Sequence, residues 1–342
     1  MDVNFTRTNG AIDELLDEVM RLAEVHHPEM IREILLNGLK AGQEIDYLAD
    51  LKMMRTTLRE MRTTTRLFGA YRGRKKVTIF GSARTDPDEP IYKKCVTFAR
   101  QLNRLGYMVI TGGGPGIMQA GNEGAGPENS FAVNIRLPFE QDTNPVMEKS
   151  RNVIFYKYFF NRKVAFLKEA HAVALFPGGF GTLDEAMETL TLVQTGKNPP
   201  IPLVLIDDDD GGYWEPWFEF LRDTLLTRGL ISGEDFGLFT ITRDPFEAAQ
   251  VINDFYRIYH SSRFVGKTLV IRLNKPLHAE QIATLQDEFA EIIESGSRLV
   301  TTPPLPAEAD QPDLLDLPRL AFDFNRRNYG LLEAFLRRLN SF

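Results

Sequence analysis

The pattern of apolar and polar positions divides the chain into three stretches. In the first, apolar residues recur at helical spacing from residue 11 to about residue 70, beginning with Ile12, Leu15, Leu16, Val19 and Leu22. This spacing predicts an N-terminal helical region over residues 1–72, with further helices at 30–39 and 45–67. The last of these helices carries four arginines, Arg55, Arg59, Arg62 and Arg66. We interpret them either as a solvated helix face or as a contact for an anion or a second subunit.

In the second stretch, residues 73–260, short apolar runs that are typical of buried strands alternate with helical segments. The expected strands lie at 77–80, 107–111, 131–137, 153–155, 172–176 and 203–206. The expected helices lie at 92–105, 158–170, 183–195 and 214–228, with a further helical stretch after the second strand. Strands that alternate with helices form parallel sheets through right-handed crossovers. The sequence therefore predicts an α/β fold with a Rossmann-like, doubly wound parallel sheet.

The third stretch, residues 261–342, forms a separate unit in this interpretation. A strand at 268–273, a helix at 279–295, a strand at 319–324 and a helix at 329–339 are expected, with a proline-rich loop before the second strand. These elements predict a small α+β domain that follows the sheet domain.

Composition narrows the classes of protein that fit this arrangement. Of the 342 residues, 43% are hydrophobic and 25% are charged, the balance of an ordinary globular protein. The net charge of −7 argues against non-specific binding to a nucleic-acid polymer, which needs a basic surface. The single cysteine, Cys95, excludes an internal disulfide, and no apolar stretch approaches the ~20 residues of a membrane-spanning helix. Because the first residues, MDVNFTRTNG, show no basic patch followed by an apolar run, we expect a cytoplasmic protein without a membrane partner.

The first candidate binding element is the loop TGGGPGIM at residues 111–118, between an expected strand and an expected helix. Glycines let the backbone approach a ligand closely, and a helix N-terminus offers free N–H groups and the positive end of the helix dipole. Pro115 suits a first helical turn. The loop lacks the lysine of a Walker loop and does not follow the dinucleotide fingerprint. It is either a phosphate-binding loop or a tight turn without a ligand.

The second candidate is the loop PGGFGTLDE at residues 177–185, again between a strand and a helix. Two such loops at the carboxyl ends of parallel strands can line one crevice. Thr182 and Glu185 also fit a capping box, in which the glutamate accepts a bond from the N-cap backbone. Glu185 is therefore either a helix cap or a catalytic carboxylate.

Other charged groups carry weaker signals. Arg162 and Lys163 precede the expected strand at 172–176, and helical spacing does not show which of them faces the crevice, or whether both are solvated. Residues 207–210 are four aspartates, which we interpret as a solvated turn in preference to a metal site. The five histidines show no ligand spacing.

Together these motifs resemble the LOG (Lonely guy) family, whose members were often labelled lysine decarboxylases. The resemblance covers residues 75–230 approximately and rests on GGGPGIM, Asn122–Ala125, the Arg162–Lys163 pair and PGGFGTLDE. It implies a Rossmann-like enzyme that releases a free base and ribose 5-phosphate from a nucleoside 5′-monophosphate. The two terminal regions lie outside the resemblance and take no role from it.

The resemblance also assigns roles to individual residues. Glu185 and Arg162 become the catalytic residues. Substrate or phosphate binding falls on Gly81, Ser82, Gly112, Gly113, Gly114, Gly116, Met118, Lys163, Pro177, Gly178, Gly179, Gly181 and Thr182. Neither a metal nor a cofactor is implied. Many plant-type members have serine where Pro115 stands, so this chain lacks one N–H and one hydroxyl for the phosphate.

We therefore expect hydrolysis of the N-glycosidic bond of a nucleoside 5′-monophosphate, such as AMP or a cytokinin riboside monophosphate. Cleavage builds an oxocarbenium-like charge that a carboxylate can stabilise. The alternative is a non-catalytic nucleotide sensor of the same fold. Decarboxylation follows only from the old label, because pyridoxal phosphate needs a Schiff-base lysine that nothing here marks. The family and the aromatic stretch Phe155–Phe160 together predict a homo-oligomer.

Overall fold

The computed structural model describes residues 2–137 and 142–342, and the chain falls into two compact units, Met1–Thr65 and Arg66–Phe342. The first unit contains the helices α1 (Ala11–Leu22) and α2 (Pro28–Glu44) and most of α3 (Leu48–Gly69). The boundary between the units therefore lies within α3, a few residues before the boundary after residue 72 that the sequence indicated. The division of the chain into three domains, at 72 and at 260, stays a prediction.

A buried ion pair connects the two helices at the start of the first unit. Arg32 of α2 is 4% exposed and donates a hydrogen bond to the carboxylate of Asp13 on α1. The other oxygen of that carboxylate accepts the backbone N–H of Asn9 at 2.7 Å. Each oxygen of the buried carboxylate therefore has a hydrogen-bond donor, as a buried charge requires.

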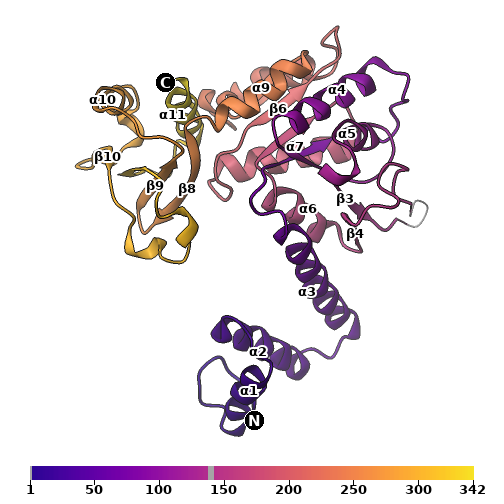
Figure 1. The fold of residues 1–342 in the computed structure, drawn as a ribbon, viewed down its shortest axis with the longest axis vertical. Coiled ribbons are helices and arrows are strands. Elements are labelled where there is room, and N and C mark those ends of the chain that lie inside the picture. Colours follow the sequence, from indigo (N-terminus) through magenta and orange to yellow (C-terminus); the bar gives the residue numbers. More distant parts are fainter. Residues whose placement is uncertain (1, 138–141) are drawn as a thin grey trace. The chain divides into compact units, whose positions relative to one another are not determined.

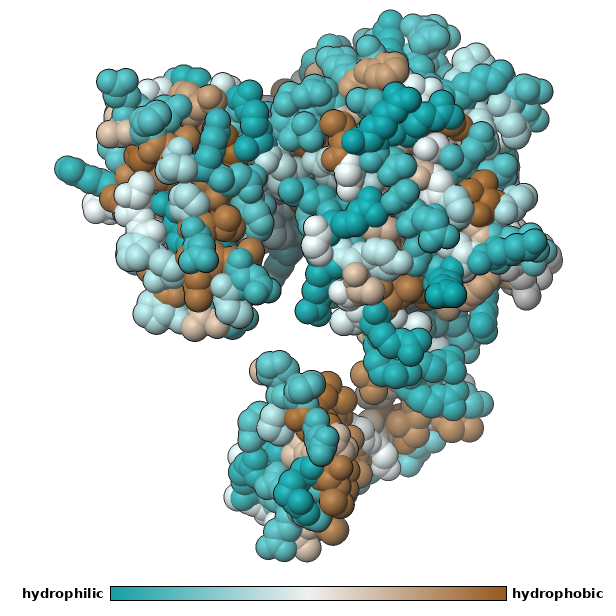
Figure 2. Space-filling model, viewed as in Figure 1, coloured by the Kyte–Doolittle hydropathy of each residue, from teal (hydrophilic) through white to brown (hydrophobic). Residues whose placement is uncertain are grey.

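The surface of the first unit is rich in apolar side chains, which appear brown in Figure 2. Leu15 and Leu22 of α1 are 65% and 67% exposed, and Met30 of α2 is 66% exposed. The four arginines of α3 are also exposed. Their exposure is consistent both with a solvated helix face and with a surface that contacts an anion or a second subunit. Exposed apolar surface on this scale is typical of a contact with another molecule.

The second unit is built on a seven-stranded sheet with the strand order β4-β3-β2-β1-β5-β6-β7 (Figure 1). Its strands are β1 (Lys76–Phe80), β2 (Met108–Thr111), β3 (Ser130–Ile135), β4 (Val153–Tyr156), β5 (Ala172–Leu175), β6 (Leu203–Ile206) and β7 (Thr240–Thr242). Every neighbouring pair is parallel, and Val77 in β1 pairs with Val109 in β2 and Ala172 in β5. The doubly wound α/β fold predicted from the sequence is confirmed.

Helices cover both faces of this sheet. Successive side chains of a strand point to opposite faces, so the apolar strands present an apolar surface on each face that a helix must bury. The helices are α4 (Pro90–Arg104), α5 (Ile117–Ala125), α6 (Phe159–Lys168), α7 (Phe180–Gln194), α8 (Trp214–Phe220), which continues as a π-helix over 221–226, and α9 (Pro245–Phe255). On one face, Val77 and Ile79 share a core with α4, α5 and α9. On the other face, Thr78 donates to the carbonyl oxygen of Phe166 in α6, and Phe80 meets the ring of Phe166 edge-on.

The strand order reverses direction at β1. Strands β2 to β4 follow on one side of β1, and β5 to β7 follow on the other. At such a reversal the loops that leave the carboxyl ends of the central strands diverge and leave a crevice. The loop after β2 is GGGPG, and the loop after β5 is PGG. The topology therefore brings both predicted glycine loops to the same edge of the sheet.

A four-stranded antiparallel sheet with the order β10-β11-β9-β8 follows the sheet domain. The elements of this part are β8 (Tyr259–Val265), β9 (Thr268–Leu273), α10 (Ala279–Glu288), β10 (Val300–Thr301), β11 (Arg319–Asp323) and α11 (Tyr329–Ser341). Phe322 of β11 and Phe335 of α11 pack together in its core. Glu308 is completely buried there and accepts hydrogen bonds from Arg272 and Arg319. The two strands and two helices expected in this part of the chain are present within the second compact unit, although α10 ends at Glu288 and not at residue 295.

Among the α-helices and strands of the described residues, the sequence pattern missed four, namely β7, α9, β8 and β10. Strands β7 and β10 have three and two residues, too few to show an alternation. Strand β8 is only half-buried over most of its length, so it lacks an apolar run. The start of helix α9 could have been predicted from the sequence, because Asp244 is an N-cap residue that accepts the N–H of Phe246, and Pro245 occupies the first turn.

None of the helices in the described part of the chain is long and apolar enough to cross a membrane.

Glu333 on α11 is a buried acid whose titration is expected to make the stability of the second unit depend on pH. Its side chain is 1% exposed, its Oε2 has no hydrogen-bond partner among the described residues, and burial raises its pKa from 4.5 to about 7. The folded state thus favours the protonated acid. This stabilisation is complete below about pH 4.5 and is lost as the pH rises through about 7, by roughly 3 kcal/mol at most.

Glu333→Gln should therefore resist urea better than the wild type at about pH 8, and its stability should change less between about pH 5 and 8. The neutral amide has no charge to desolvate at any of these pH values. Urea unfolding of both proteins at the two pH values measures the difference. The same pH dependence in both proteins would show that Glu333 is not the responsible group.

Candidate active site

Three loops meet at the carboxyl edge of the parallel sheet. The backbone N–H of Ser82, after β1, donates to the carbonyl oxygen of Pro177, after β5, at 3.0 Å. The carbonyl oxygen of Ser82 accepts the N–H of Ile117, at the start of α5, at 2.9 Å. Ser82 therefore ties the first turn of α5 to the loop that leads into α7.

Two glycines of the first loop permit this close approach. Gly116 has a φ of +64°, and a Cβ at this position would overlap the carbonyl oxygen of Ser82. A Cβ on Gly112 would overlap the guanidinium group of Arg162 and come within 2.5 Å of the sulfur of Met118. Neighbouring protein atoms therefore leave no room for a Cβ at either position, so the packing of the loop requires both glycines even without a ligand.

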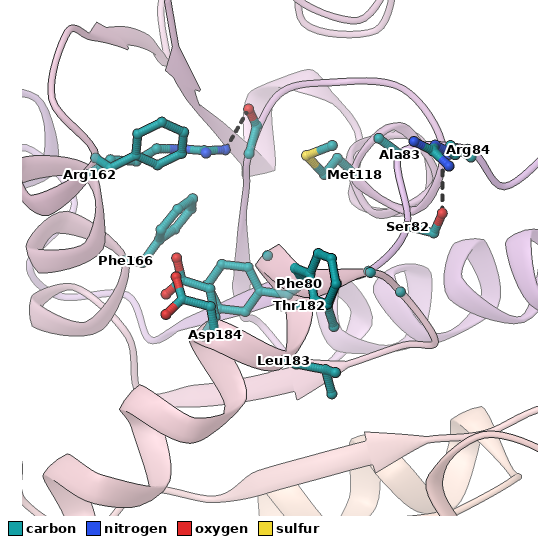
Figure 3. Close-up of a pocket in the computed structure, with 18 of the residues that line it drawn as sticks. Phe80, Ser82, Ala83, Arg84, Met118, Arg162, Phe166, Thr182, Leu183 and Asp184 are labelled. Atoms are coloured by element: carbon teal, nitrogen blue, oxygen red, sulfur yellow. Dashed lines mark hydrogen bonds between the residues drawn. The ribbon is translucent and has the colours of Figure 1, made fainter. Parts of the chain in front are cut away.

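A pocket of about 800 Å³ opens beside these loops (Figure 3). Ten of the fifteen site residues predicted from the sequence line it: Gly81, Ser82, Gly112, Met118, Arg162, Gly178, Gly179, Gly181, Thr182 and Glu185. Gly114 lines a smaller neighbouring cavity of about 160 Å³ together with Gly112, Met118 and Arg162. The other four predicted residues, Gly113, Gly116, Lys163 and Pro177, line neither cavity, and the glycines and proline among them shape the surrounding backbone.

The N-termini of α5 and α7 are both open toward ligands. Helix α7 begins at Phe180 with Gly179 as its N-cap, and α5 begins at Ile117 with Gly116 as its N-cap. Neither helix has a side-chain hydrogen bond at its cap. Although the N–H groups of Ile117 and Thr182 already donate to backbone carbonyls, the positive end of each helix dipole favours an anion at these positions.

Arg162 reaches the pocket from α6. Its Nε donates to the carbonyl oxygen of Val133 at 2.8 Å, and its Nη2 donates to that of Gly112 at 3.3 Å. Its guanidinium carbon lies 5.0 Å from the ring centre of Phe166. Burial lowers the pKa of Arg162 to about 10, and the charge of Glu185 opposes this change. The structure therefore places Arg162, and not Lys163, in the pocket, a choice that helical spacing left open.

Glu185 is the buried carboxylate of the pocket. The residue is 8% exposed, and its Oε2 has no hydrogen-bond partner in the described part of the chain. Burial raises its pKa to about 7, while the positive charges of Lys163 and Arg162 act in the opposite direction. A carboxylate in a cleft whose pKa lies near neutrality is a typical functional group.

The interpretation of Thr182 and Glu185 as a capping box is wrong. The helix expected to start at residue 183 begins at Phe180, so Thr182 already lies in its first turn. The backbone N–H of Thr182 donates to the carbonyl oxygen of Gly179 at 3.0 Å, and no side chain caps the helix. Capping therefore does not explain the presence of a glutamate at position 185.

Lys163 joins α6 to α7 outside the pocket. Its Nζ lies 2.8 Å from Oδ2 of Asp184 and 2.9 Å from Oε2 of Glu188. Burial acts to lower the pKa of Lys163, but the hydrogen bonds that its ammonium group donates to these two acids outweigh burial, and the pKa is raised. Lys163 therefore influences Glu185 through its charge without lining the pocket.

The pocket also contains residues that no motif indicated, among them Arg84, Phe159, Phe166 and Tyr213. Tyr213 is held there by the turn after β6. Asp207 is fully buried and accepts backbone N–H bonds from Tyr213 and Trp214, and the Tyr213 hydroxyl donates to the carbonyl oxygen of Gly178 at 2.5 Å. The interpretation of the aspartate run as a solvated turn is therefore wrong for Asp207, which anchors the start of α8.

Gly178 and Gly179 form a matched pair for testing how tightly the second loop is packed. A Cβ on Gly178 would overlap the Thr182 hydroxyl, whereas a Cβ on Gly179 would meet nothing within 4 Å. We expect Gly178→Ala to lower the free energy of unfolding by about 1–3 kcal/mol and Gly179→Ala to change it by less than about 0.5 kcal/mol. Urea unfolding measures both values. Equal effects of the two substitutions would contradict the packing seen at Gly178.

Comparison with known proteins agrees with the resemblance read from the motifs. A family described as "Possible lysine decarboxylase" matches residues 116–252. Over 159 residues the chain is 26% identical to the pyrimidine/purine nucleotide 5′-monophosphate nucleosidase of Escherichia coli (strain K12), which covers 44% of this chain and 35% of that protein. Over 143 residues it is 28% identical to the cytokinin riboside 5′-monophosphate phosphoribohydrolase LOG of Oryza sativa subsp. japonica, which covers 40% of this chain and 55% of that protein.

These matches are partial on both sides. The chain spans about a third of the length of the bacterial nucleosidase and about half of the length of the rice protein. Among solved structures, the molybdenum cofactor carrier protein of Chlamydomonas reinhardtii is 18% identical, with a TM-score of 0.38, over 52% of this chain and 96% of that chain. A likeness at this level assigns no function.

The segment matched by the family contains the residues on which the pocket depends. Arg162, the PGGFGT loop and Glu185 all fall within residues 116–252, and they come together at the carboxyl edge of the sheet. Through this segment the chain resembles the family described as "Possible lysine decarboxylase", in agreement with the LOG-family resemblance that its motifs indicated.

Proposed function

We propose that this protein hydrolyses the N-glycosidic bond of a nucleoside 5′-monophosphate, such as AMP or a cytokinin riboside monophosphate, and releases the free base and ribose 5-phosphate. The observation that carries the proposal is Glu185, a buried carboxylate whose Oε2 has no partner among the described residues, in a pocket that also holds Arg162. The open N-termini of α5 and α7 add a place for the phosphate. The names of the two relatives agree with this substrate class.

The chemistry follows from the residues of the pocket. Cleavage of the N-glycosidic bond builds positive charge on the ribose, as in other glycoside hydrolysis. The ionised carboxylate of Glu185 stabilises that charge and orients or deprotonates the attacking water. Arg162, which donates to two backbone carbonyls, acts to lower the pKa of Glu185 and so favours its ionised form, and it bonds to the loop that carries Gly112.

Release of ribose 5-phosphate from a panel of nucleoside monophosphates tests the proposal, with the corresponding nucleosides as controls. The helix N-termini favour a phosphate, and a nucleoside has no phosphate to place there. We therefore expect nucleosides to react at least roughly a hundredfold more slowly. Binding of a monophosphate without release of product would favour the nucleotide sensor. Equal rates for nucleosides and monophosphates would contradict the role of the helix N-termini.

We also propose that the protein is a homo-oligomer. Phe155, Phe159 and Phe160 are 39%, 55% and 48% exposed, and Phe180 at the edge of the pocket is 94% exposed. Aromatic side chains gathered in this way are typical of a subunit contact. Light scattering at micromolar concentration should give the mass of at least a dimer, and a monomeric mass would contradict the proposal. The cytoplasmic location stays a prediction.

A further inference from the structure

Arg84 is a charged residue of the pocket that the mechanism above does not use. It follows Ser82 in the turn after β1, lines the pocket and is exposed. Within residues 2–137 and 142–342, its guanidinium group has neither a carboxylate nor another hydrogen-bond partner. A cation without a partner at the edge of a ligand pocket is free to bind an anionic group of the ligand.

The other charges of the pocket already have partners. Two arginines and two carboxylates line it: Arg84, Arg162, Asp184 and Glu185. Arg162 donates to two backbone carbonyls and interacts with the charge of Glu185. Asp184 pairs with Lys163, which lies outside the pocket. The positive charge of Arg84 is therefore the one that remains uncompensated among the described lining residues.

The backbone places Arg84 beside the helix ends that suit a phosphate. Ser82 bonds to the loop before α7 and to the first turn of α5, and its Oγ accepts the backbone N–H of Arg84 at 3.0 Å. Figure 3 shows Arg84 and Arg162 on opposite sides of Met118. The two arginines therefore lie at different places in the pocket, Arg162 where it interacts with the charge of Glu185 and Arg84 beside Ser82.

The first glycine loop increases the need for such a residue. Pro115 has no N–H, so the GGGPG loop offers one backbone donor fewer than a loop with another residue at that position. An arginine presents several N–H donors in a planar group that matches phosphate oxygens. The N–H donors of the Arg84 side chain can take the place of the backbone N–H that the loop lacks at Pro115.

We propose that Arg84 binds the 5′-phosphate of the substrate and determines the preference for a nucleoside monophosphate over the nucleoside. This inference rests on the proposed function, because it assigns the phosphate end of the same pocket. It predicts that Arg84 contributes to substrate binding through charge and has no effect on the binding of an uncharged nucleoside.

Binding of AMP and adenosine, measured by calorimetry, tests the proposal in the Glu185→Gln background, where turnover does not consume the ligand. Arg84→Met should weaken AMP binding by roughly ten- to a hundredfold, the range for a lost charge-assisted contact, and leave adenosine binding unchanged. Arg84→Lys should restore most of the affinity. The difference between the Met and Lys variants should shrink at high salt, because an exposed ionic contact is screened. Arg104→Met, an exposed arginine at the end of α4, serves as the control.

The outcomes separate this proposal from the proposed function. If Arg84→Met binds AMP as tightly as its parent, Arg84 does not hold the phosphate, whatever the wild type does with AMP. If AMP and adenosine lose affinity equally, the substitution disturbs the pocket and the phosphate role is wrong. If AMP binding depends on Arg84 but the wild type releases no ribose 5-phosphate, the inference stands and the hydrolase activity fails. No binding of AMP to any variant overturns both.

Discussion

Glu185→Gln is expected to lower the rate of ribose 5-phosphate release by at least roughly a hundredfold, the low end of general-base effects. The amide keeps the shape of the side chain but has no charge to stabilise an oxocarbenium-like ribose and no basicity to activate water. Because Glu185 caps no helix and its Oε2 has no hydrogen-bond partner in the described part of the chain, the variant should fold with nearly unchanged stability. Product release and thermal unfolding, measured side by side, give both results.

Glu188→Gln is the matched control for this experiment. Glu188 lies one turn further along α7, pairs with Lys163 and does not line the pocket. Its substitution should change the rate only through the charge that reaches Glu185, by a few-fold at most on the scale of a partly exposed ion pair. A Glu185→Gln enzyme as active as the Glu188→Gln enzyme would remove the centre of the proposed mechanism.

The pH dependence of the reaction follows from the same carboxylate. Burial raises the pKa of Glu185 to about 7, and the reaction uses the ionised form. In the wild type, kcat/KM should therefore reach a plateau above about pH 7 and fall about tenfold for each pH unit below it. The residual rate of Glu185→Gln should lack this acidic limb. An unchanged limb in that variant would assign it to a different group.

Arg162→Met should have the second large effect, a loss of roughly a hundredfold or more in turnover, as for other groups that organise charge in an active site. The substitution removes the donors to the carbonyl oxygens of Val133 and Gly112 and one of the positive charges that favour ionised Glu185. The acidic limb of kcat/KM should also move to higher pH, because the pKa of Glu185 rises further. Assays of turnover across pH measure both changes.

Lys168→Met on the same helix controls for loss of a positive charge. Lys168 pairs with Glu169 and lies outside the pocket, so turnover and the acidic limb should stay where they are in the wild type. A shift of the limb in Lys168→Met equal to that in Arg162→Met would mean that Arg162 acts by general electrostatics and not from its position in the pocket.

The positions of Glu185 and of the two glycine loops could be predicted from the sequence because each depends on local chemistry. Apolar runs of four to five residues that alternate with helical segments specify a parallel sheet, and the loops after its strands must then lie at one edge. Gly112, Gly178 and Glu185, which the sequence predicts at this edge, all line the pocket. The family motif added the role of Glu185, which the local pattern alone divided between a cap and a catalytic group.

Only the tertiary structure shows which side chains enter the pocket and where helix α7 begins. A period of 3.6 residues says which side chains share a helix face but not which face meets the sheet, so it did not separate Arg162 from Lys163. The start of α7 depended on the hydrogen bond from Thr182 to the carbonyl oxygen of Gly179, which moved Thr182 into the helix and excluded the capping box. Arg84 and Tyr213 join the pocket through loops after β1 and β6 that are more than a hundred residues apart in the sequence. Their positions, and the burial that raises the pKa of Glu185, arise only when distant segments pack together, because burial and unpaired charge are properties of the surroundings and not of the residue.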